Sequence, residues 1–493
     1  MSELPKGWLE TTLGEVVDYG TTLKAEPDEI SGDEWVLELE DIEKGNSRIV
    51  GRFSFADRKS KSTKNRFSKG DVLYGKLRPY LNKVVLADSD GLCTTEIVPI
   101  KQTTAVENRY VFHWLKGPRF LNYAASISHG LNMPRLGTDA GRKAPFILAP
   151  LAEQKRIADK LDSVLMRVDA CRERLERVPV LIDRFRRSVL VAATTGRLTE
   201  SWREGKSSCF DSTKVFSLPQ GYKRLAKQSF KVTDIDYPAI ELPGGWTIST
   251  IADLYNRNVI VDFADGNHGS LYPRKEDFDG KGALFLTASQ IDDRWGIAIE
   301  ACPRLSREKS KLLNKGWTKQ GDVLLTHNAT VGRVAILEGT TEDVLLGTSV
   351  TFYRLNSDAY CPEFLRIVFA SPFFQEQLTS VMAQTTRDQV PITKQVSLHV
   401  VCPPIDEQRE IAQRVESLLV LSNRLESRLA VTRDAMGRLV PALLAKAFRG
   451  ELVPQDPYDE PAEKLLEGLK ARTTSLGTKG KRSKRSSTAA AEI

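Results

Sequence analysis

Two stretches of the chain place apolar residues alternately four and three positions apart. The first stretch begins at Ile157 and the second at Ile411. This spacing is an a/d heptad seam, and many residues between the apolar positions are charged, so each stretch predicts a long helix with one narrow apolar stripe. The predicted seam residues are Ile157, Leu161, Val164, Val168, Leu175 and Phe185 in the first helix and Ile411, Val415, Leu418, Leu425, Leu429 and Leu443 in the second.

The two helical stretches are copies of one sequence. The first copy opens with Glu153-Gln154 and closes at Gly196, and the second opens with Glu407-Gln408 and closes at Gly450 at the same offset. Because a single helix cannot bury a narrow stripe alone, two matched copies predict an intramolecular antiparallel coiled coil. The alternative is two amphipathic helices packed into separate globular cores, but an insertion-free match over the whole length favours a shared seam.

Each helical copy contains a proline. Pro179 lies inside the first copy and Pro441 inside the second. Because proline removes a backbone donor and clashes with the preceding turn, we expect each helix to be kinked or split at this point.

The segments before the helices also correspond to each other. The opening 4–8, Leu-Pro-Lys-Gly-Trp, returns at 242–246 as Leu-Pro-Gly-Gly-Trp, and a Gly-Asp-Val-Leu strand occurs in both halves. Short β-rich runs separated by turn residues, with one helix at 108–125 and a matching one at 362–379, predict a mixed α/β (α+β) fold in each half. The difference in residue number between corresponding positions changes along the globular halves and becomes constant in the helices. The two halves therefore share a scaffold but differ in their loops.

This pattern divides the chain into six segments. Two pseudo-repeated globular domains are separated by two long helices that form the antiparallel coiled coil. The expected boundaries are 1–150 for the first domain, 151–200 for the first helix, 201–241 for a polar linker, 242–404 for the second domain, 405–455 for the second helix and 456–493 for a basic, disordered tail.

Composition narrows the class of protein. No apolar run is long enough to span a membrane, and the first residues do not form a signal peptide. The six cysteines are scattered without a CxxC pair, which is typical of reduced residues in a cytoplasmic protein. Most of the formal charge of +7 comes from Lys470 onward, in a Gly/Ser/Thr-rich stretch that a solvated tail explains.

Both globular halves carry a basic region at corresponding positions. The first lies between Arg48 and Lys83, and the second at 301–335. One such region is usually a solvated face, but two equivalent ones on a duplicated scaffold favour contact with phosphates. The strongest candidates follow the Gly-Asp-Val-Leu strands, where side chains suited to base edges and phosphates gather: Lys76, Arg78, Tyr80, Asn82 and Lys83 in the first half and Thr326, Asn328, Thr330 and Arg333 in the second.

A second pair of loops supplies weaker candidates. These are Asn132 and Arg135 in the first half and Arg387 and Gln389 in the second. An ordinary polar loop explains these residues about as well, and for the first pair of loops the alternative is a structural β-turn shaped by Pro79 and Gly332.

The sequence offers no catalytic or metal-binding constellation. The stretch from Gly70 to Lys76 superficially fits a P-loop, but Leu77 replaces the required Ser/Thr and a strand fills its interior. Methyltransferase, dinucleotide-binding, zinc-protease and nucleophile-elbow motifs are missing, and the five histidines are dispersed. We therefore predict neither catalytic nor metal-ligating residues.

The combination of these motifs resembles the specificity (S) subunit of type I restriction–modification systems. The resemblance covers residues 1–455 and rests on the duplicated target-recognition-like halves, each followed by a Pro-Leu/Ile-x-Glu-Gln-x-x-Ile-Ala helix that closes with Gly-x-Leu. Two features depart from the family pattern. Thr195 stands where the second closing motif has Arg449, and the basic tail has no assigned role.

The resemblance implies a non-catalytic, sequence-specific DNA-binding subunit. Each half would read one part of a bipartite, asymmetric site, and the helix pair would act as a ruler between the half-sites. It would also dock two methyltransferase (M) subunits, which bind S-adenosylmethionine and methylate adenine at N6. Restriction (R) subunits that use ATP and Mg would complete the complex, and the chain itself would bind no cofactor.

Two other classes of function compete with this reading. The first is a nuclease or methyltransferase with an unrecognised site, which activity of the purified chain without partners would support. The second is a coiled-coil adaptor that binds only protein, which a lack of sequence-specific DNA binding by the assembled complex would support.

Overall fold

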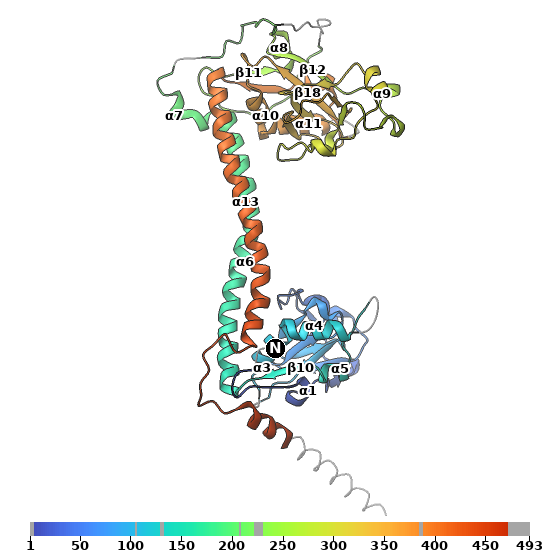
Figure 1. Ribbon diagram of the computed structural model, residues 1–493, viewed down its shortest axis with the longest axis vertical. Coiled ribbons are helices and arrows are strands. Elements are labelled where there is room, and N and C mark those ends of the chain that lie inside the picture. Colours follow the sequence, from blue (N-terminus) through green and yellow to red (C-terminus); the bar gives the residue numbers. More distant parts are fainter. Residues whose placement is uncertain are drawn as a thin grey trace, which may run out of the picture. The chain divides into compact units, whose positions relative to one another are not determined.

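The computed structural model describes residues 4–103, 106–128, 133–206, 209–220, 230–383 and 388–471 (Figure 1). The chain forms two compact units. The first consists of Met1–Glu176 and Ala430–Ile493, and the second of Arg177–Leu429. Each unit therefore combines one globular part with a portion of each long helix. In the described ranges, no helix is both long and apolar enough to cross a membrane.

Ten short strands lie in the described residues of the first globular part. They are β1 Leu9–Thr12, β2 Leu23–Ala25, β3 Trp35–Leu37, β4 Phe53–Ser54, β5 Lys64–Phe67, β6 Val72–Gly75, β7 Val84–Leu86, β8 Gly91–Cys93, β9 Ile97–Ile100 and β10 Pro145–Leu148. The helices are α1 Leu13–Val16, α2 Phe55–Arg58, α3 Asn108–Lys116, α4 Pro118–Ile127 and α5 Thr138–Arg142. The strands pair in the orders β1-β10, β2-β5-β8-β3-β4 and β7-β6-β9.

Over the residues described, the globular part of the second unit repeats this plan with fewer strands. Its strands are β11 Thr247–Thr250, β12 Ile260–Asp265, β13 Leu284–Leu286, β14 Trp317–Thr318, β15 Val323–Thr326, β16 Val334–Ile336, β17 Val344–Leu346, β18 Val350–Leu355 and β19 His399–Cys402. Its helices are α7 Glu200–Arg203, α8 Ile251–Asn256, α9 Arg307–Leu312, α10 Pro362–Ala370, α11 Pro372–Ala383 and α12 Ile392–Gln395. The sheet orders are β11-β19, β12-β18-β15-β16 and β13-β17-β14.

Corresponding elements pair in the same way in both units. The antiparallel pair β1-β10 matches β11-β19, and the parallel pair β3-β8 matches β13-β17. Helix α3 packs on β6 and β7, as α10 packs on β15 and β16. The predicted mixed fold of two pseudo-repeated domains is confirmed.

The single helix expected in each half is broken into two. The first break lies between α3 and α4 at Pro118, and the second between α10 and α11 at Pro372. The residues before these prolines, Gly117 and Ser371, have extended backbones. Proline disfavours a helical conformation in the residue that precedes it and is well tolerated in the first turn of a new helix, so each stretch forms two helices.

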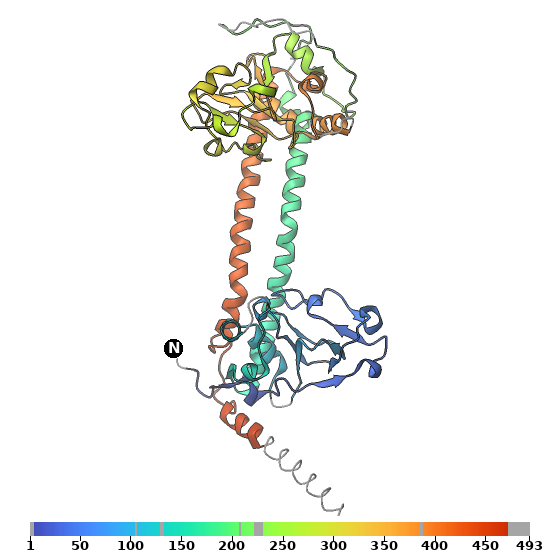
Figure 2. The ribbon, with the colours of Figure 1, turned by 90° about the vertical axis from the view of Figure 1, so that its right-hand side faces the viewer.

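The two long helices are α6, Leu151–Thr194, and α13, Ile405–Ala447. Within each unit they pack antiparallel. In the second unit Val189 shares a core with Ile411 while Arg186 contacts Ser422, so positions rise along α6 as they fall along α13. In the first unit Ile157 shares a core with Leu444. Figure 2 shows both helices as continuous rods.

The predicted seam residues differ in their burial. Ile157, Leu161, Val168, Ile411, Val415 and Leu429 are buried, whereas Val164, Leu175, Leu418 and Leu443 are half-buried. Phe185 and Leu425 lie exposed, at 37% and 44% of their surface. These two side chains are available to a partner.

Neither long helix is split at its proline. Both α6 and α13 continue through Pro179 and Pro441. Proline at position 179 cannot donate to the carbonyl of Leu175, four residues earlier. The guanidinium Nη2 of Arg433 donates to that carbonyl at 3.0 Å and replaces the missing amide.

The segments that follow each closing glycine are ordered where the structure describes them. The tail expected to be disordered from residue 456 is helical at 462–471, and Ala462 is fully buried in the core of the first unit. The amide of Ala462 donates to the carbonyl of Gly7 at 2.9 Å. In the polar linker, the amide of Phe210 donates to the carbonyl of Gly245 at 3.0 Å. Each Gly-Trp opening is thus covered by the segment that follows a long helix.

Candidate nucleic-acid interface

The Glu-Gln pair at the start of each long helix fixes the globular part on that helix. Gln154 accepts the amide of Glu107, which precedes α3, at 3.1 Å and donates to the carbonyl of Ala149 at 2.8 Å. In the second unit Gln408 accepts the amide of Cys361, before α10, at 2.8 Å and donates to Pro403 at 2.8 Å. The candidate loops are therefore carried on a scaffold that is anchored in the same way twice.

The two candidate loops of the first half lie side by side. Leu77 and Arg135 form an isolated antiparallel bridge. The amide of Arg78 donates to the carbonyl of Pro134 at 2.7 Å, and the amide of Leu136 donates to Lys76 at 3.0 Å. Two segments distant in the sequence thus form one surface.

The side chains of this surface are arranged around a left-handed residue. Arg78 has φ +50° and an exposed side chain, and Tyr80, in the short 3₁₀ turn Pro79–Leu81, is 60% exposed. Arg135 is exposed and its Nε donates to Glu96 at 3.1 Å. Lys76 is half-buried. An exposed arginine beside an exposed aromatic ring can contact phosphates, base edges and base faces.

Two other candidates of the first half, Asn82 and Lys83, are half-buried. The Nζ of Lys83 donates to the carbonyl of Leu39 at 2.6 Å and ties the loop to the 3₁₀ turn Leu39–Asp41. Asn82 is half-buried and has φ +49° at the end of the 3₁₀ turn. Asn132 lies outside the described residues.

The second half builds the corresponding surface with different side chains. Asn328 and Gln389 form the bridge that matches Leu77 and Arg135. The amide of Ala329 donates to Asp388 at 3.2 Å, and Ala329 takes the left-handed φ of +64° where the first half has Arg78. Asn328, Thr330 and Gln389 are half-buried and offer amide and hydroxyl groups. Arg387 falls outside the ranges that the structure describes.

Thr326 is a correction to the predicted contacts. Its side chain is fully buried at the end of β15, and its Oγ1 accepts the amide of Arg333 at 2.9 Å. It therefore shapes the loop and cannot reach a ligand. Arg333 is half-buried, and its Nη1 donates to the carbonyl of Ile291 at 2.8 Å.

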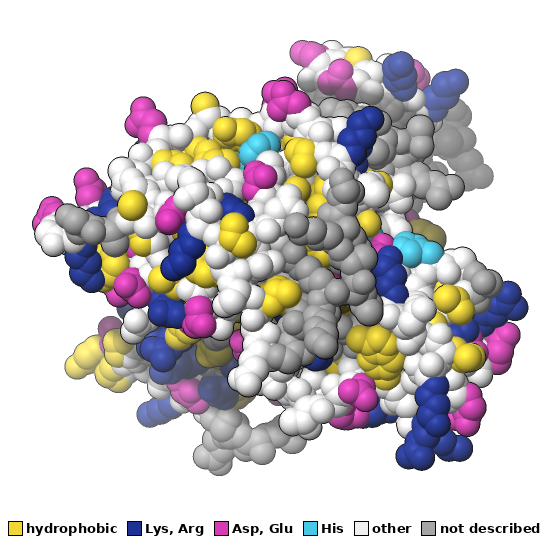
Figure 3. Space-filling view, turned by 90° about the horizontal axis from the view of Figure 1, so that it is seen from above, with side chains coloured by type: hydrophobic (Ala, Val, Ile, Leu, Met, Phe, Trp, Pro, Cys, Tyr) yellow, Lys and Arg dark blue, Asp and Glu magenta, His cyan; other side chains and the backbone are white. Residues whose placement is uncertain are grey.

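The basic regions are partly neutralised by acidic residues elsewhere in the sequence. Arg58 pairs with Asp41, and Arg66 with Glu34 at 2.7 Å. In the second unit Lys309 pairs with Asp277 at 3.1 Å. Figure 3 likewise shows basic and acidic side chains interspersed over the face that it displays. The excess positive charge expected from the sequence is therefore smaller than the count of Lys and Arg in each run.

A hairpin that the sequence analysis missed lies next to the second surface. Ile291 and Ile297 form a bridge, and the turn between them carries Arg294 and Trp295. Trp295 has φ +71°, and the guanidinium of Arg366 lies 4.4 Å from the centre of its ring. The only signal in the sequence was the turn composition of residues 292–296.

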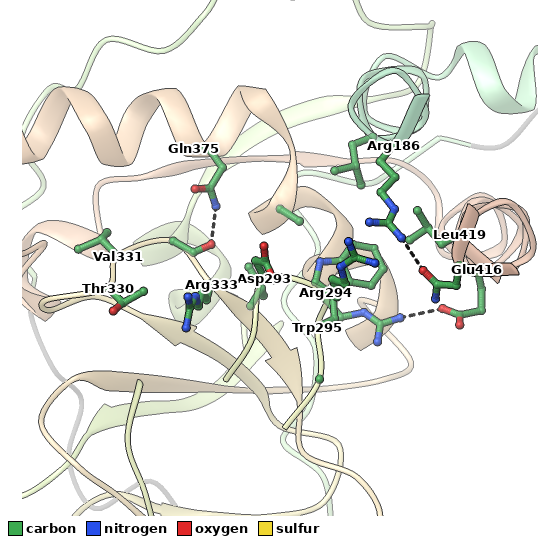
Figure 4. A pocket seen from close by; sticks show the side chains of 17 residues that line it. Arg186, Asp293, Arg294, Trp295, Thr330, Val331, Arg333, Gln375, Glu416 and Leu419 are labelled. Atoms are coloured by element: carbon green, nitrogen blue, oxygen red, sulfur yellow. Dashed lines mark hydrogen bonds and ion pairs between the residues drawn. The ribbon is translucent and has the colours of Figure 1, made fainter. Parts of the chain in front are cut away.

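This hairpin borders a cleft of about 510 Å³ in the second unit (Figure 4). Thr330 and Arg333 from the candidate loop line it together with Arg294 and Trp295. Residues of α6 and α13 form the opposite wall. The candidate loop is therefore connected to the helix pair through the hairpin.

Beneath the second loop lies a buried histidine. His327 is 5% exposed, and its Nε2 has no hydrogen-bond partner among the residues that the structure describes. Burial lowers the pKa of His327 to about 4, although Asp265 opposes the effect. The imidazole is therefore neutral at neutral pH and contributes packing rather than charge.

Within the described ranges, no group of three or more His, Cys, Asp and Glu side chains is placed to hold a metal ion. The geometry instead defines a duplicated α/β scaffold, in which each unit presents two polar loops joined by a β-bridge.

Comparison with known proteins shows one class to which this chain is similar. A family model described as the type I restriction modification DNA specificity domain matches residues 5–179. The specificity subunit of the type I restriction enzyme EcoBI from Escherichia coli is 27% identical over 82% of this chain and 80% of that subunit. The EcoKI specificity subunit from Escherichia coli strain K12 is 28% identical over 76% of this chain and 74% of its own length.

A solved structure shares the fold. The HsdS subunit from Thermoanaerobacter tengcongensis superposes with a TM-score of 0.59 at 20% identity and covers 91% of this chain and 98% of its own. The family model, the relatives and the solved structure support the resemblance of this chain to type I restriction–modification specificity subunits. The relatives are named as specificity subunits, which agrees with the predicted non-catalytic role.

Proposed function

We propose that this chain reads a bipartite, asymmetric DNA site and directs adenine-N6 methylation and restriction by partner subunits. The observation that carries the proposal is the repeated loop pair. Leu77–Arg135 in one unit and Asn328–Gln389 in the other have the same backbone pairing. A fixed backbone with exchanged side chains is the arrangement expected of a module whose specificity varies between copies.

The two units carry different hydrogen-bonding groups at equivalent places. The first presents guanidinium groups and an exposed phenol, at Arg78, Arg135 and Tyr80. The second presents amides and a hydroxyl, at Asn328, Gln389 and Thr330. Arginine and asparagine or glutamine match different base edges in the major groove. Two different half-sites are therefore expected, and a palindrome is not.

The helix pair of the second unit carries an apolar face suited to a protein partner. Leu181 and Phe185 on α6, and Leu421 and Leu425 on α13, are all between 37% and 57% exposed. In each pair, the first residue lies one position before a buried seam residue and the second lies three positions after it. The seam residue is Ile182 in α6 and Ser422 in α13. Because the helices are antiparallel, the same rotation from the seam brings both pairs to one face.

We assign this apolar face to a methyltransferase (M) subunit. Exposed apolar patches of this kind mark protein interaction sites. In the assembled complex two M subunits would bind S-adenosylmethionine, and R subunits would use ATP and Mg, so this chain needs no cofactor of its own. The complex would act on DNA in the cytoplasm.

The experiment that tests the function is co-expression with the neighbouring methyltransferase gene, followed by mapping of N6-methyladenine across the host genome. The expected result is one bipartite, asymmetric motif that disappears when this chain is omitted. A stable complex that produces no new motif would contradict DNA recognition and favour a protein-binding adaptor.

The partner face has its own test. Leu181→Glu with Leu425→Glu should weaken binding of the methyltransferase by about 100-fold or more, because such interface anchors contribute several kcal/mol. Leu312→Glu is the matched control, since Leu312 on α9 is 67% exposed and lies off the helix pair. Equal binding by the double variant and the control would remove this face from the interface.

A further inference from the structure

One carboxylate joins three elements of the second unit. The carboxylate of Glu426 on α13 accepts a hydrogen bond from Arg186 of α6 at 3.0 Å and one from Arg294 of the hairpin at 2.9 Å. Arg294 contacts both oxygens of this carboxylate. Its side chain is 20% exposed and that of Arg186 is 17% exposed. The guanidinium of Arg294 is 51% exposed, and its bidentate pairing with Glu426 fixes orientation as well as distance.

The same arginine enters the helix seam. The Nε of Arg186 donates at 2.8 Å to the hydroxyl of Ser422, which is fully buried at a heptad position where the pattern expects an apolar residue. Its Nη2 donates to Asn423 at 2.5 Å. A buried polar contact at one seam position selects a single register of a coiled coil at some cost in stability.

The hairpin that carries Arg294 is closed at its tip by hydrogen bonds to Asp292. The Oδ1 of Asp292 accepts the amides of Arg294 at 2.8 Å and Gly296 at 2.7 Å. Trp295 is held under Arg366, whose Nη2 reaches Glu416 on α13 at 3.2 Å. Figure 4 shows Arg294 and Trp295 between the candidate loop and the helices.

The hairpin also supports the candidate recognition loop. The side chain of Arg333, at the end of that loop, donates to the carbonyl of Ile291 at the base of the hairpin. A continuous set of contacts therefore runs from the loop through the hairpin to Glu426 and on to the seam.

Among its described residues, the first unit shows no such connection. Its corresponding hairpin, bridged between Ile42 and Ile49, has Gly45 near the tip. By the repeat of the helices, Arg172 stands in place of Glu426, and the seam positions are Val168 and Val440. The polar layer is therefore specific to the second unit and is not a requirement of the shared fold.

We propose that Glu426, with Arg294 and Arg186, is a positioning residue that locks the second recognition loop at one place and orientation on the helix pair. The consequence is discrimination of the spacer between the two half-sites to a single base pair. The inference rests on the proposed function, because a spacer exists only if both units read DNA.

The test uses the complex reconstituted with its methyltransferase and DNA duplexes that carry the methylated motif at its native spacer, one base pair longer and one shorter. In Arg294→Ala and in Glu426→Gln, the preference for the native spacer should fall by about ten-fold or more, since displacement of a reacting group by about 1 Å can cost 100-fold. Arg294→Lys should restore part of the preference, and the double variant should lose no more than either single variant.

The matched control is Arg304→Ala. This substitution removes an ion pair with Glu342 in the same globular part. The side chain of Arg304 is 38% exposed, which is comparable to that of Arg294. An unchanged spacer preference in both Arg294→Ala and Glu426→Gln would overturn the proposal, and an equal change in the control would do the same.

A second readout does not depend on DNA. Amide hydrogen exchange in the complex without DNA should rise at residues 292–298 in Arg294→Ala and stay unchanged there in Arg304→Ala. Unchanged exchange at the hairpin would overturn the locking role. If the unaltered complex methylated no bipartite motif, the proposed function would fall, and the exchange measurement would still decide whether Glu426 holds the hairpin.

Discussion

The indole Nε1 of Trp246 donates a hydrogen bond of 2.8 Å to the buried carboxylate of Glu407. The first unit repeats this contact between Trp8 and Glu153, also at 2.8 Å. The opening phrase of each globular half is thus bound to the first turn of the long helix that follows it. The repeat in the sequence is a repeat of one specific contact.

The two carboxylates differ in their other partners, so replacing each glutamate by glutamine should change the free energy of unfolding by different amounts. Glu407 also accepts Thr199 at 2.7 Å and Arg203 at 2.6 Å. Glu407→Gln should lower the free energy of unfolding of the second unit by about 2–3 kcal/mol, because Arg203 loses its charged partner. Unit-resolved hydrogen exchange in urea measures this loss.

Glu153→Gln is the matched control in the first unit. One oxygen of Glu153 has no hydrogen-bond partner within the described part of the chain, and burial raises the pKa of this carboxyl group. A neutral amide should therefore change the unfolding free energy by less than about 1 kcal/mol. Equal losses in the two variants would contradict this account.

His327 should make the second unit sensitive to acid. Its folded-state pKa is about 4 because of burial, against an ordinary value of 6.5, so the unfolded chain binds more protons between these values. The stability of the folded state is complete above the unfolded pKa and should fall by on the order of 3 kcal/mol as the pH drops to about 4. Urea unfolding of the unaltered chain and of His327→Gln measures this difference, and parallel pH profiles would refute the assignment.

Arg78→Gly should relax one half-site only. Glycine accepts the left-handed φ of +50° without strain, so the variant removes the guanidinium and leaves the loop intact. Discrimination at one half-site should fall by about 10- to 100-fold, as expected for one specific contact worth 1–3 kcal/mol. Methylation of site libraries measures it, with Asn328→Ala as the converse variant. Equal loss at both half-sites would indicate a folding defect.

Insertion of one heptad into each long helix should lengthen the recognised spacer. Seven residues add about 10.5 Å of helix, close to the rise of three base pairs. Insertions after Glu176 and after Leu429, where the two units divide both helices, preserve the seam. The methylated motif should gain about three base pairs of spacer. Insertion into α6 alone is the mismatched control, and an unchanged spacer in the double insertion would exclude a ruler.

Arg433 should matter only while Pro179 is present. Arg433→Ala removes the donor to the Leu175 carbonyl and should destabilise the first unit by about 0.5–1.5 kcal/mol. In Pro179→Ala the backbone amide of residue 179 serves that carbonyl, so the same substitution should then cost close to nothing. A double-mutant cycle by urea unfolding measures the coupling, and additive losses would rule it out.

Features with a regular period could be predicted from the sequence. The long helices follow from the heptad spacing, and the correspondence of Trp8 with Trp246 follows from the repeated phrase. The sequence predicts two corresponding loops in each half. It does not predict that Asn328 lies beside Gln389 or that Leu77 lies beside Arg135. The repeat made the candidate loops predictable, because each loop has a counterpart in the other half.

Features set by tertiary contacts could not be predicted in this way. The burial of Thr326 depends on a hydrogen bond to Arg333, and the role of Arg294 depends on Glu426, 132 positions away in the sequence. The helix at 462–471 did leave a signal, since Ala462, Leu465 and Leu469 follow amphipathic spacing, but the basic composition of the following residues obscured it.

The division of the chain between the units has a consequence for synthesis. The second unit is one continuous stretch, Arg177–Leu429, whereas the first is assembled from both ends of the chain. Its core includes Leu444, Phe448 and Ala462, which are synthesised after the whole of the second unit. The half that is made first therefore completes its core only after the other half has been made, and its apolar face stays exposed during that interval.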